Sequence, residues 1–219
     1  MITFNEILEN AEIRAYIEKG NENLGAMGFT EHARAHAMRA AGVASGILEK
    51  LGYSEKEIEL AKIAGYMHDI GNCVNRHDHA HSGAIMAMMI LRGLDMPYEE
   101  IAVVMAAIGN HDEKTGTPVD AVSAALILAD KGDVRRSRVR AQRESDFDIH
   151  DRVNYAAVKS SLRVDAQEKV IEMTVELDEN WCSVLDYFEI FTERMVMCRR
   201  AAAKLGCRFS IVANDGKIL

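Results

Sequence analysis

The chain has 219 residues, of which 48% are hydrophobic and 27% charged, so it can bury the core of one large domain, or of one domain with a small appendage. Its formal net charge of −8 argues against binding of nucleic-acid duplexes, which requires a basic surface. No apolar run approaches the roughly 18 residues that a membrane span needs, and the four cysteines form no C-x-x-C pair. We therefore expect a cytoplasmic protein that binds neither duplex nucleic acid nor a membrane.

The N-terminal quarter of the chain predicts two long helices. The first twenty residues predict one amphipathic helix, without the basic-then-apolar order of a signal peptide. A second helical pattern follows Thr30 and runs to Leu51, where Gly52 ends it.

The next helix carries the most informative residues of the chain, His68 and Asp69. Ser54-Glu-Lys-Glu57 is a capping box that opens this helix, and Gly71 is expected to close it in a left-handed conformation. Adjacent residues on a helix splay apart, so His68 and Asp69 can bind one ion together only near a helix end. An imidazole beside a carboxylate is a mixed nitrogen and oxygen donor pair that suits Fe, Mn, Co, Zn or Ni ions.

Three further helices are expected before residue 145. An apolar run within residues 85–93 predicts one of them, and Pro97 starts another, which delivers His111. The segment Thr117-Pro-Val-Asp120 combines an N-cap at Thr117 with a proline in the first turn, so Asp130 lies about three turns inside the last helix.

The composition then changes to that of a small sheet. Residues 161–164, 170–177 and 208–213 read as strands, and a long amphipathic helix over 183–205 ends at Gly206. Three strands and one helix are too small to be stable alone.

We therefore divide the chain into a helical metal-binding domain, residues 1–150, and a small β-β-α-β appendage, residues 151–219. The fold class is mostly α: a helical bundle with a C-terminal α+β appendage that has a short antiparallel sheet and one long helix. We expect the appendage to pack on the bundle or to form a homodimer contact.

Five motifs stand in a fixed order along the bundle. They are His36-Ala-Met-Arg39, His68-Asp69, the His-x-x-x-Gly-Ala stretch from His79 to Ala84, Ala107-Ile-Gly-Asn-His111, and Leu128-Ala-Asp130-Lys131. In order and spacing the chain resembles the HD superfamily of metal-dependent phosphohydrolases over about residues 30 to 140. The resemblance implies an HD-type helical bundle with one or two divalent ions.

The resemblance also implies the ligands. His36, His68, Asp69 and Asp130 would hold the first ion, and Asp69 would bridge to a second ion completed by His79 and His111. Because nitrogen and oxygen donors accept several ions, the metal is one of Fe, Mn, Co, Ni, Zn or Mg.

The chemistry implied by this family is hydrolysis of a phosphate ester or anhydride of a small molecule, such as a nucleotide, by a metal-activated hydroxide. Asp69 and Lys131 would be the catalytic residues. The cyclic-dinucleotide branch carries paired histidines and a Gly-Tyr-Pro, which this chain lacks. Two alternatives stay open: a diiron oxygenase on the same scaffold, and a non-catalytic metal-binding sensor.

A basic segment follows Asp130. Between Lys131 and Arg143 there are six basic residues and one acid, Asp133. One interpretation is a solvated helix end. The other is that Lys131 and one or two of Arg135, Arg136 and Arg138 bind the phosphate of a small anionic substrate, since arginine binds phosphate oxygens in pairs. Lys131, Arg135 and Arg136 are the candidate substrate-binding residues.

The remaining histidines have weaker assignments. His32 lies four residues before His36, which predicts a shared helix face and either a substrate contact or a surface position. His77 and His81 flank His79 and are expected in a polar loop. Asp112 or Glu113, directly after His111, is a candidate for orienting water or a proton, although a surface position is expected.

Overall fold

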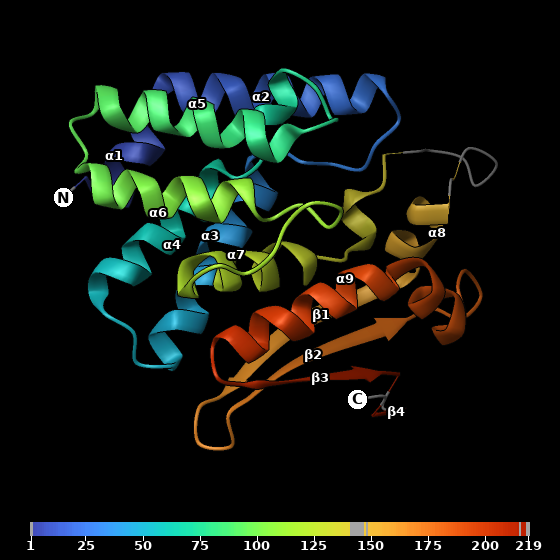
Figure 1. Ribbon diagram of the computed structural model, residues 1–219. Coiled ribbons are helices and arrows are strands. Elements are labelled where there is room, and N and C mark those ends of the chain that lie inside the picture. The colour runs from blue at the N-terminus through green and yellow to red at the C-terminus, as the bar shows by residue number, and fades with distance from the viewer. Residues whose placement is uncertain (1, 141–146, 148, 215, 218–219) are drawn as a thin grey trace.

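Helices form most of the fold, as expected, and a small sheet with one long helix completes it at the C-terminus (Figure 1). The computed structural model describes residues 2–140, 147, 149–214 and 216–217. Within these residues, no helix has the length and apolar character needed to cross a membrane. The helices are α1 (Phe4–Glu9), α2 (Ala11–Ala26), α3 (Arg34–Lys50), α4 (Glu55–Met67), α5 (His79–Gly93), α6 (Tyr98–Gly109), α7 (Ala121–Lys131), α8 (Ile149–Ala156) and α9 (Val184–Lys204), with 3₁₀ turns η1 (Ile70–Cys73) and η2 (Arg136–Arg138).

The expected N-terminal helix is two helices, because Asn10 interrupts it. The Asn10 side chain accepts hydrogen bonds from the backbone N–H groups of Glu12 and Ile13, and so caps α2. A residue that serves as an N-cap takes an extended backbone conformation, which ends α1 at Glu9. Short polar side chains compete for backbone donors in this way, and the apolar periodicity alone does not reveal it.

Helices α3 and α4 form the centre of the bundle. Helix α3 begins at Arg34, four residues after Thr30, and ends before Gly52, whose φ is +78° as expected for a helix-terminating glycine. Helix α4 is opened by the predicted capping box of Ser54 and Glu57. A Cβ added to Gly65 would lie 2.6 Å from the Cα of Ala41, so a glycine is needed for the close approach of the two helices. This approach sets the separation of their metal-ligand candidates.

Helix α7 starts three residues later than predicted. Its N-cap is Asp120, not Thr117: the Asp120 carboxylate accepts from the backbone N–H of Ser123, and the Ser123 hydroxyl accepts from the backbone N–H of Asp120. Both residues are good N-caps, and the reciprocal bond with Ser123 favours Asp120. Asp130 is still close to the C-terminal end of this buried helix.

The C-terminal sheet is mixed. Its strands are β1 (Ala157–Asp165), β2 (Val170–Leu177), β3 (Arg208–Ala213) and β4 (Gly216–Lys217), in that order across the sheet. The β1–β2 and β3–β4 pairs are antiparallel, but β2 and β3 are parallel, which corrects the expected antiparallel sheet in this detail. The reason is the connection: α9 crosses from the end of β2 back to its start, so β3 runs in the same direction as β2.

Helix α9 joins the sheet to the bundle, since it packs on α7 and on β2 and β3 (Figure 1). Its inward face contributes Tyr187, Phe191, Met195 and Cys198, all at least 95% buried. The division of the chain at residue 150, and a homodimer through the appendage, stay predictions.

Candidate metal centre

Every predicted ligand lies at or near the end of a helix. His36 is in the first turn of α3, and His68 is the C-cap residue directly after α4, followed by Asp69. His79 is the first residue of α5, and His111 comes two residues after α6. Asp130 is the penultimate residue of α7. Side chains from five helices therefore meet inside the bundle, as in other helical metal sites.

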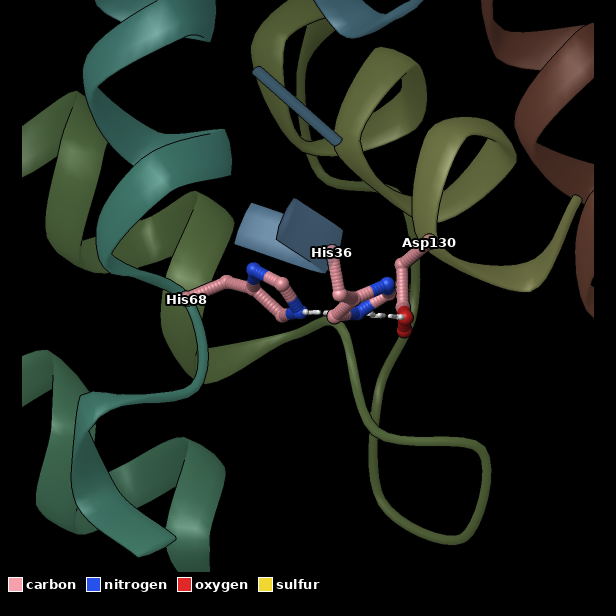
Figure 2. Close-up of side chains that lie close together, drawn as sticks. All are labelled: His36, His68 and Asp130. Carbon is pink, nitrogen blue, oxygen red and sulfur yellow. Dashed lines mark hydrogen bonds and ion pairs between the residues drawn. The ribbon is translucent and has the colours of Figure 1, made fainter. Parts of the chain in front are cut away.

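Four donor atoms form what we call the first cluster: Nε2 of His36, Nε2 of His68, Oδ2 of Asp69 and Oδ1 of Asp130. The two imidazole nitrogens are 3.2 Å apart, and Oδ1 of Asp130 lies 3.3 Å from His36 and 3.7 Å from His68. Oδ2 of Asp69 lies 3.2 Å from His68 and 3.7 Å from His36. Figure 2 shows three of these side chains pointing toward one another. Ligands about 2.0–2.2 Å from one ion have separations of about this size.

Three donor atoms form the second cluster: Oδ1 of Asp69 and Nε2 of His79 and His111. The two nitrogens are 3.1 Å apart, and Oδ1 of Asp69 lies 3.5 Å from His79 and 3.8 Å from His111. The two oxygens of the one Asp69 carboxylate thus face different clusters. This is the arrangement expected of a ligand that bridges two ions.

The position of Asp69 depends on the 3₁₀ turn η1, which packs tightly against α5. A Cβ on Gly71 would lie 2.0 Å from the backbone oxygen of His79, so only glycine allows this approach. Gly71 is not left-handed, and this corrects the expected reason for its presence. Asn72, in the same turn, donates from its side chain to Oδ1 of Asp69 over 2.8 Å and fixes the carboxylate.

The histidines are oriented by their Nδ1 atoms. Nδ1 of His68, His79 and His111 contacts the backbone oxygens of Gly65, Arg76 and Ile108 at 2.8, 3.1 and 2.6 Å, and carbonyl oxygens only accept hydrogen bonds. Nδ1 of His36 lies 2.7 Å from Oδ2 of the buried Asp133. Each Nδ1 must therefore carry the proton, which leaves the lone pair on Nε2 whenever the ring is neutral.

The hydrogen bonds at Nδ1 show whether a cation fits between the facing Nε2 atoms of each cluster. Lone pairs on two neutral Nε2 atoms only 3.1–3.2 Å apart repel, and each pair needs a proton or a metal ion between the rings. Oδ2 of Asp69 is also buried without a hydrogen-bond partner among the described residues. The donor set, its separations and the unpaired oxygen therefore fit a divalent cation in the first cluster, and the same facing nitrogens fit a second.

Charge differs between the clusters. Burial lowers the pKa of His68, but the carboxylates of Asp69 and Asp130 outweigh burial and raise this pKa to about 10. A proton on His68 thus supplies the positive charge of the first cluster in the metal-free chain. Burial lowers the pKa of His79 to about 4, since the Asp69 carboxylate offsets only part of it.

Both aspartates remain ionised. Burial would raise the pKa of Asp69, but the nearby His68 and His32 hold it well below its ordinary range. Lys131 and His36 do the same for Asp130, also against burial. Two buried carboxylates that stay charged are suitable metal ligands.

Asp133 organises the residues behind the first cluster. Besides His36, its side chain forms an ion pair with Nε of Arg39 at 2.9 Å and accepts a hydrogen bond from Nε of Arg135 at 2.6 Å. The buried Arg138 donates to its backbone oxygen and to that of Glu31. This role of Asp133 was not predicted from the sequence, although a single acid within a basic segment was a signal of it.

Lys131 contacts Asp130 of the first cluster. It is 7% exposed, and its Nζ lies 2.7 Å from Oδ2 of Asp130 and 3.6 Å from Oε1 of Glu113. Burial lowers the pKa of Lys131, but these two carboxylates outweigh burial and raise it. Glu113 is not at the surface as expected, because Arg194 of α9 donates to the same Oε1 over 2.8 Å. Arg194, Glu113 and Lys131 therefore form a series of charged contacts that links the appendage to the metal centre.

The two other predicted phosphate ligands lie elsewhere or are already paired. Arg135 is bound to Asp133, and Arg136 donates to the backbone oxygen of Tyr155 and to Asp178. The Arg136 guanidinium also lies over the Tyr155 ring, 4.5 Å from its centroid. Arg143 lies outside the described residues.

His32 precedes α3 instead of sharing a helix face, but it does approach the site. Its ring centroid lies 5.6 Å from that of His36, and its Nδ1 contacts the backbone oxygen of Thr30 at 2.8 Å. Burial holds its pKa well below the ordinary value. His77 and His81 are both exposed near Asp78. His77 lies in the expected loop, but His81 lies in the first turn of α5, which corrects the expectation for this residue.

Three comparisons with known proteins found similar sequences or structures. The model of the HD domain family matches residues 34–156, a range that contains all six predicted ligands. The uncharacterized protein MJ1020 of Methanocaldococcus jannaschii is 24% identical over an alignment of 216 residues. The match covers 88% of this chain and 82% of that protein. A predicted HD superfamily hydrolase from an uncultured Thermotogales bacterium, known from a crystal structure, is 25% identical with a TM-score of 0.46, and the match covers 61% of this chain and 75% of that one.

Proposed function

This chain belongs to the HD domain family, whose members bind divalent metal ions, and from this membership we propose a metal-dependent phosphohydrolase. Its substrate in this proposal is a small anionic molecule with a phosphate ester or anhydride, such as a nucleotide. The chain lacks the paired histidines and the Gly-Tyr-Pro of the cyclic-dinucleotide branch, so the proposal leaves cyclic dinucleotides out.

One observation carries this proposal: the two oxygens of Asp69 face two clusters of imidazole nitrogens. Oδ2 belongs to the cluster of His36, His68 and Asp130, and Oδ1 to that of His79 and His111. A carboxylate shared by two cations is typical of centres that stabilise both the attacking and the leaving oxygen of a phosphoryl group.

Each group of residues has a separate role in this proposal. Bound divalent ions lower the pKa of water and polarise phosphoryl oxygens. Asp69 and Asp130 hold the necessary negative charge in a buried place, and the Nδ1 partners fix each imidazole with Nε2 facing inward. In this proposal the Lys131 ammonium, 2.7 Å from Asp130, would neutralise charge that develops on the phosphoryl oxygens.

Metal analysis combined with a substrate panel tests the proposal. Protein purified without chelator is assayed for bound metal and for release of phosphate from nucleotides and small phosphate monoesters. We expect turnover that is lost in His68→Ala and retained in His77→Ala, an exposed histidine outside both clusters. A metal-loaded protein that releases no phosphate across the panel, but consumes oxygen when loaded with iron, would assign oxygenase chemistry instead.

A further inference from the structure

Arg76 lies at the edge of the second cluster, in the loop between η1 and α5. Its Nη1 is 3.4 Å from Nε2 of His79, the atom that faces His111, and 3.4 Å from Oδ1 of Asn72. The side chain is half-buried, and its guanidinium lies 5.8 Å from the ring centroid of Phe29. The aromatic ring restricts the guanidinium to this place.

The charge of Arg76 is not neutralised by the protein. Among the described residues no carboxylate oxygen lies within 4.0 Å of it, whereas Arg39 and four basic side chains between Lys131 and Arg138 are paired. Arg39, Arg135 and Arg138 face Asp133, Lys131 faces Asp130, and Arg136 faces Asp178. Arg76 is thus a cation at the second cluster that has no carboxylate partner in the described part of the chain.

The location of Arg76 beside the second cluster indicates that its partner is an anion from solution. Nε2 of His79 is a donor to the second ion under the proposed function, so a guanidinium 3.4 Å away would face a second positive charge. A guanidinium and a metal ion that approach the same imidazole repel each other, and an anionic oxygen that contacts both stabilises the pair. Guanidinium groups bind phosphate oxygens with two parallel N–H donors, which suits this position.

We propose that Arg76 is a substrate-binding residue that holds a phosphate group at the edge of the second cluster. This inference rests on the proposed function for the nature of its ligand. Lys131 lies beside the first cluster and Arg76 beside the second, so the phosphate binds between two cations at opposite ends of the centre. This assigns to Arg76 the role that the sequence analysis gave to Arg135 and Arg136.

Binding of inorganic phosphate to the metal-loaded protein tests this inference without any turnover. Calorimetric titrations compare wild type with Arg76→Met, which keeps packing on Phe29 but removes the charge, and with Arg76→Lys. The control is Arg92→Met, on the exposed last turn of α5. Bound metal and melting temperature are measured on every variant.

We expect Arg76→Met to bind phosphate at least about tenfold more weakly, as for loss of a charged hydrogen bond, with unchanged metal content and melting temperature. Arg76→Lys should recover part of the affinity, and Arg92→Met should match wild type. The inference is overturned if wild type binds no phosphate, if Arg76→Met binds it within about threefold of wild type, or if that variant loses an ion.

The two proposals fail in different ways. Phosphate binding that depends on Arg76, in a protein that hydrolyses no phosphate ester, would contradict the proposed function and leave the Arg76 site standing. A protein that hydrolyses a phosphate ester, and that inorganic phosphate inhibits equally in wild type and in Arg76→Met, would support the proposed function and contradict the Arg76 site.

Discussion

The two halves of the metal centre use the same kinds of donor in different electrostatic surroundings. The first cluster has two carboxylate oxygens for two imidazoles, and Asp133 and Lys131 lie directly behind it. The second cluster has one carboxylate oxygen for two imidazoles, whose Nδ1 atoms contact backbone oxygens, and its neighbouring cation is Arg76. We infer that the metal affinity of each cluster depends more on its negative charge than on its number of donor atoms. The first cluster should therefore bind its ion more tightly than the second.

The largest effect is expected for Asp69→Asn, because this side chain serves both clusters. The amide has the shape of the carboxylate but lacks the charge that two ions share. Loss of one electrostatic group typically costs about 10²–10³ in kcat, and here the loss should exceed that range. Metal content should fall to less than one ion per chain by elemental analysis. A variant that keeps two ions would contradict the bridging role of Asp69.

Single histidine variants separate the clusters. His79→Ala or His111→Ala should reduce the metal content from two ions to one, with cooperative unfolding preserved, because the first cluster is left intact. His68→Ala should remove the more tightly bound ion. Equal metal loss in His68→Ala and His79→Ala at every metal concentration would mean that the clusters do not differ as inferred.

Asp133→Asn tests the charged partner of His36, which the histidines of the second cluster lack. His36 would lose its charged partner, and such outer partners typically contribute 10–100-fold in metal affinity. The variant also leaves Arg138 buried without its neighbouring charge, so a lower melting temperature is expected. Titration with a metal-sensitive dye should show weaker binding of the tight ion alone, and weaker binding of both ions would contradict this specificity.

Lys131→Met tests the cation at the first cluster. Loss of a charged hydrogen bond made in the transition state should cost about 1.5–3 kcal/mol, or roughly tenfold to more than a hundredfold in rate. Arg135→Ala, whose guanidinium is bound to Asp133, should change the rate much less. Steady-state kinetics of both variants, with metal content as the control, would assign Lys131 a structural role if the two rates stayed within threefold of wild type.

The smallest effect is on the pH dependence of stability in the metal-free chain. Since the pKa of His68 is raised to about 10 in the fold, its contribution is complete below about pH 6.5 and is lost as the pH rises through 10. His79 has its pKa lowered to about 4, so it destabilises the fold as the pH falls from about 6.5 toward 4. Melting temperatures in chelator should therefore lose their alkaline slope in His68→Gln and part of their acidic slope in His79→Gln, and unchanged slopes would reject these charge states.

Much of this centre was predictable because its ligands lie at helix ends that local sequence determines. The capping box at Ser54 begins α4, and the order of the His and Asp motifs identified all six candidate ligands. Local signals failed where two residues competed for one role. Thr117 and Asp120 are both good caps, and Asn10 interrupts a continuous apolar pattern.

The partners of the ligands were not predictable, since they come from distant parts of the chain. His36 and Asp133 are 97 residues apart, and Glu113 and Arg194 are 81 residues apart. The charge of the segment after Asp130 predicted phosphate binding by Arg135 and Arg136, but composition does not determine which way a side chain points. Arg135 binds Asp133 in its own segment, and Arg136 binds Asp178, which is 42 residues away in the chain.

Anomalous diffraction from crystals of metal-loaded protein would locate the ions themselves. We expect two peaks, one within bonding distance of His36, His68, Asp69 and Asp130, and a weaker one within bonding distance of Asp69, His79 and His111, about 3.5–4 Å apart. The Asp69 carboxylate should bridge them. A single peak bound without Asp69, or peaks only outside these six side chains, would contradict a centre bridged by Asp69.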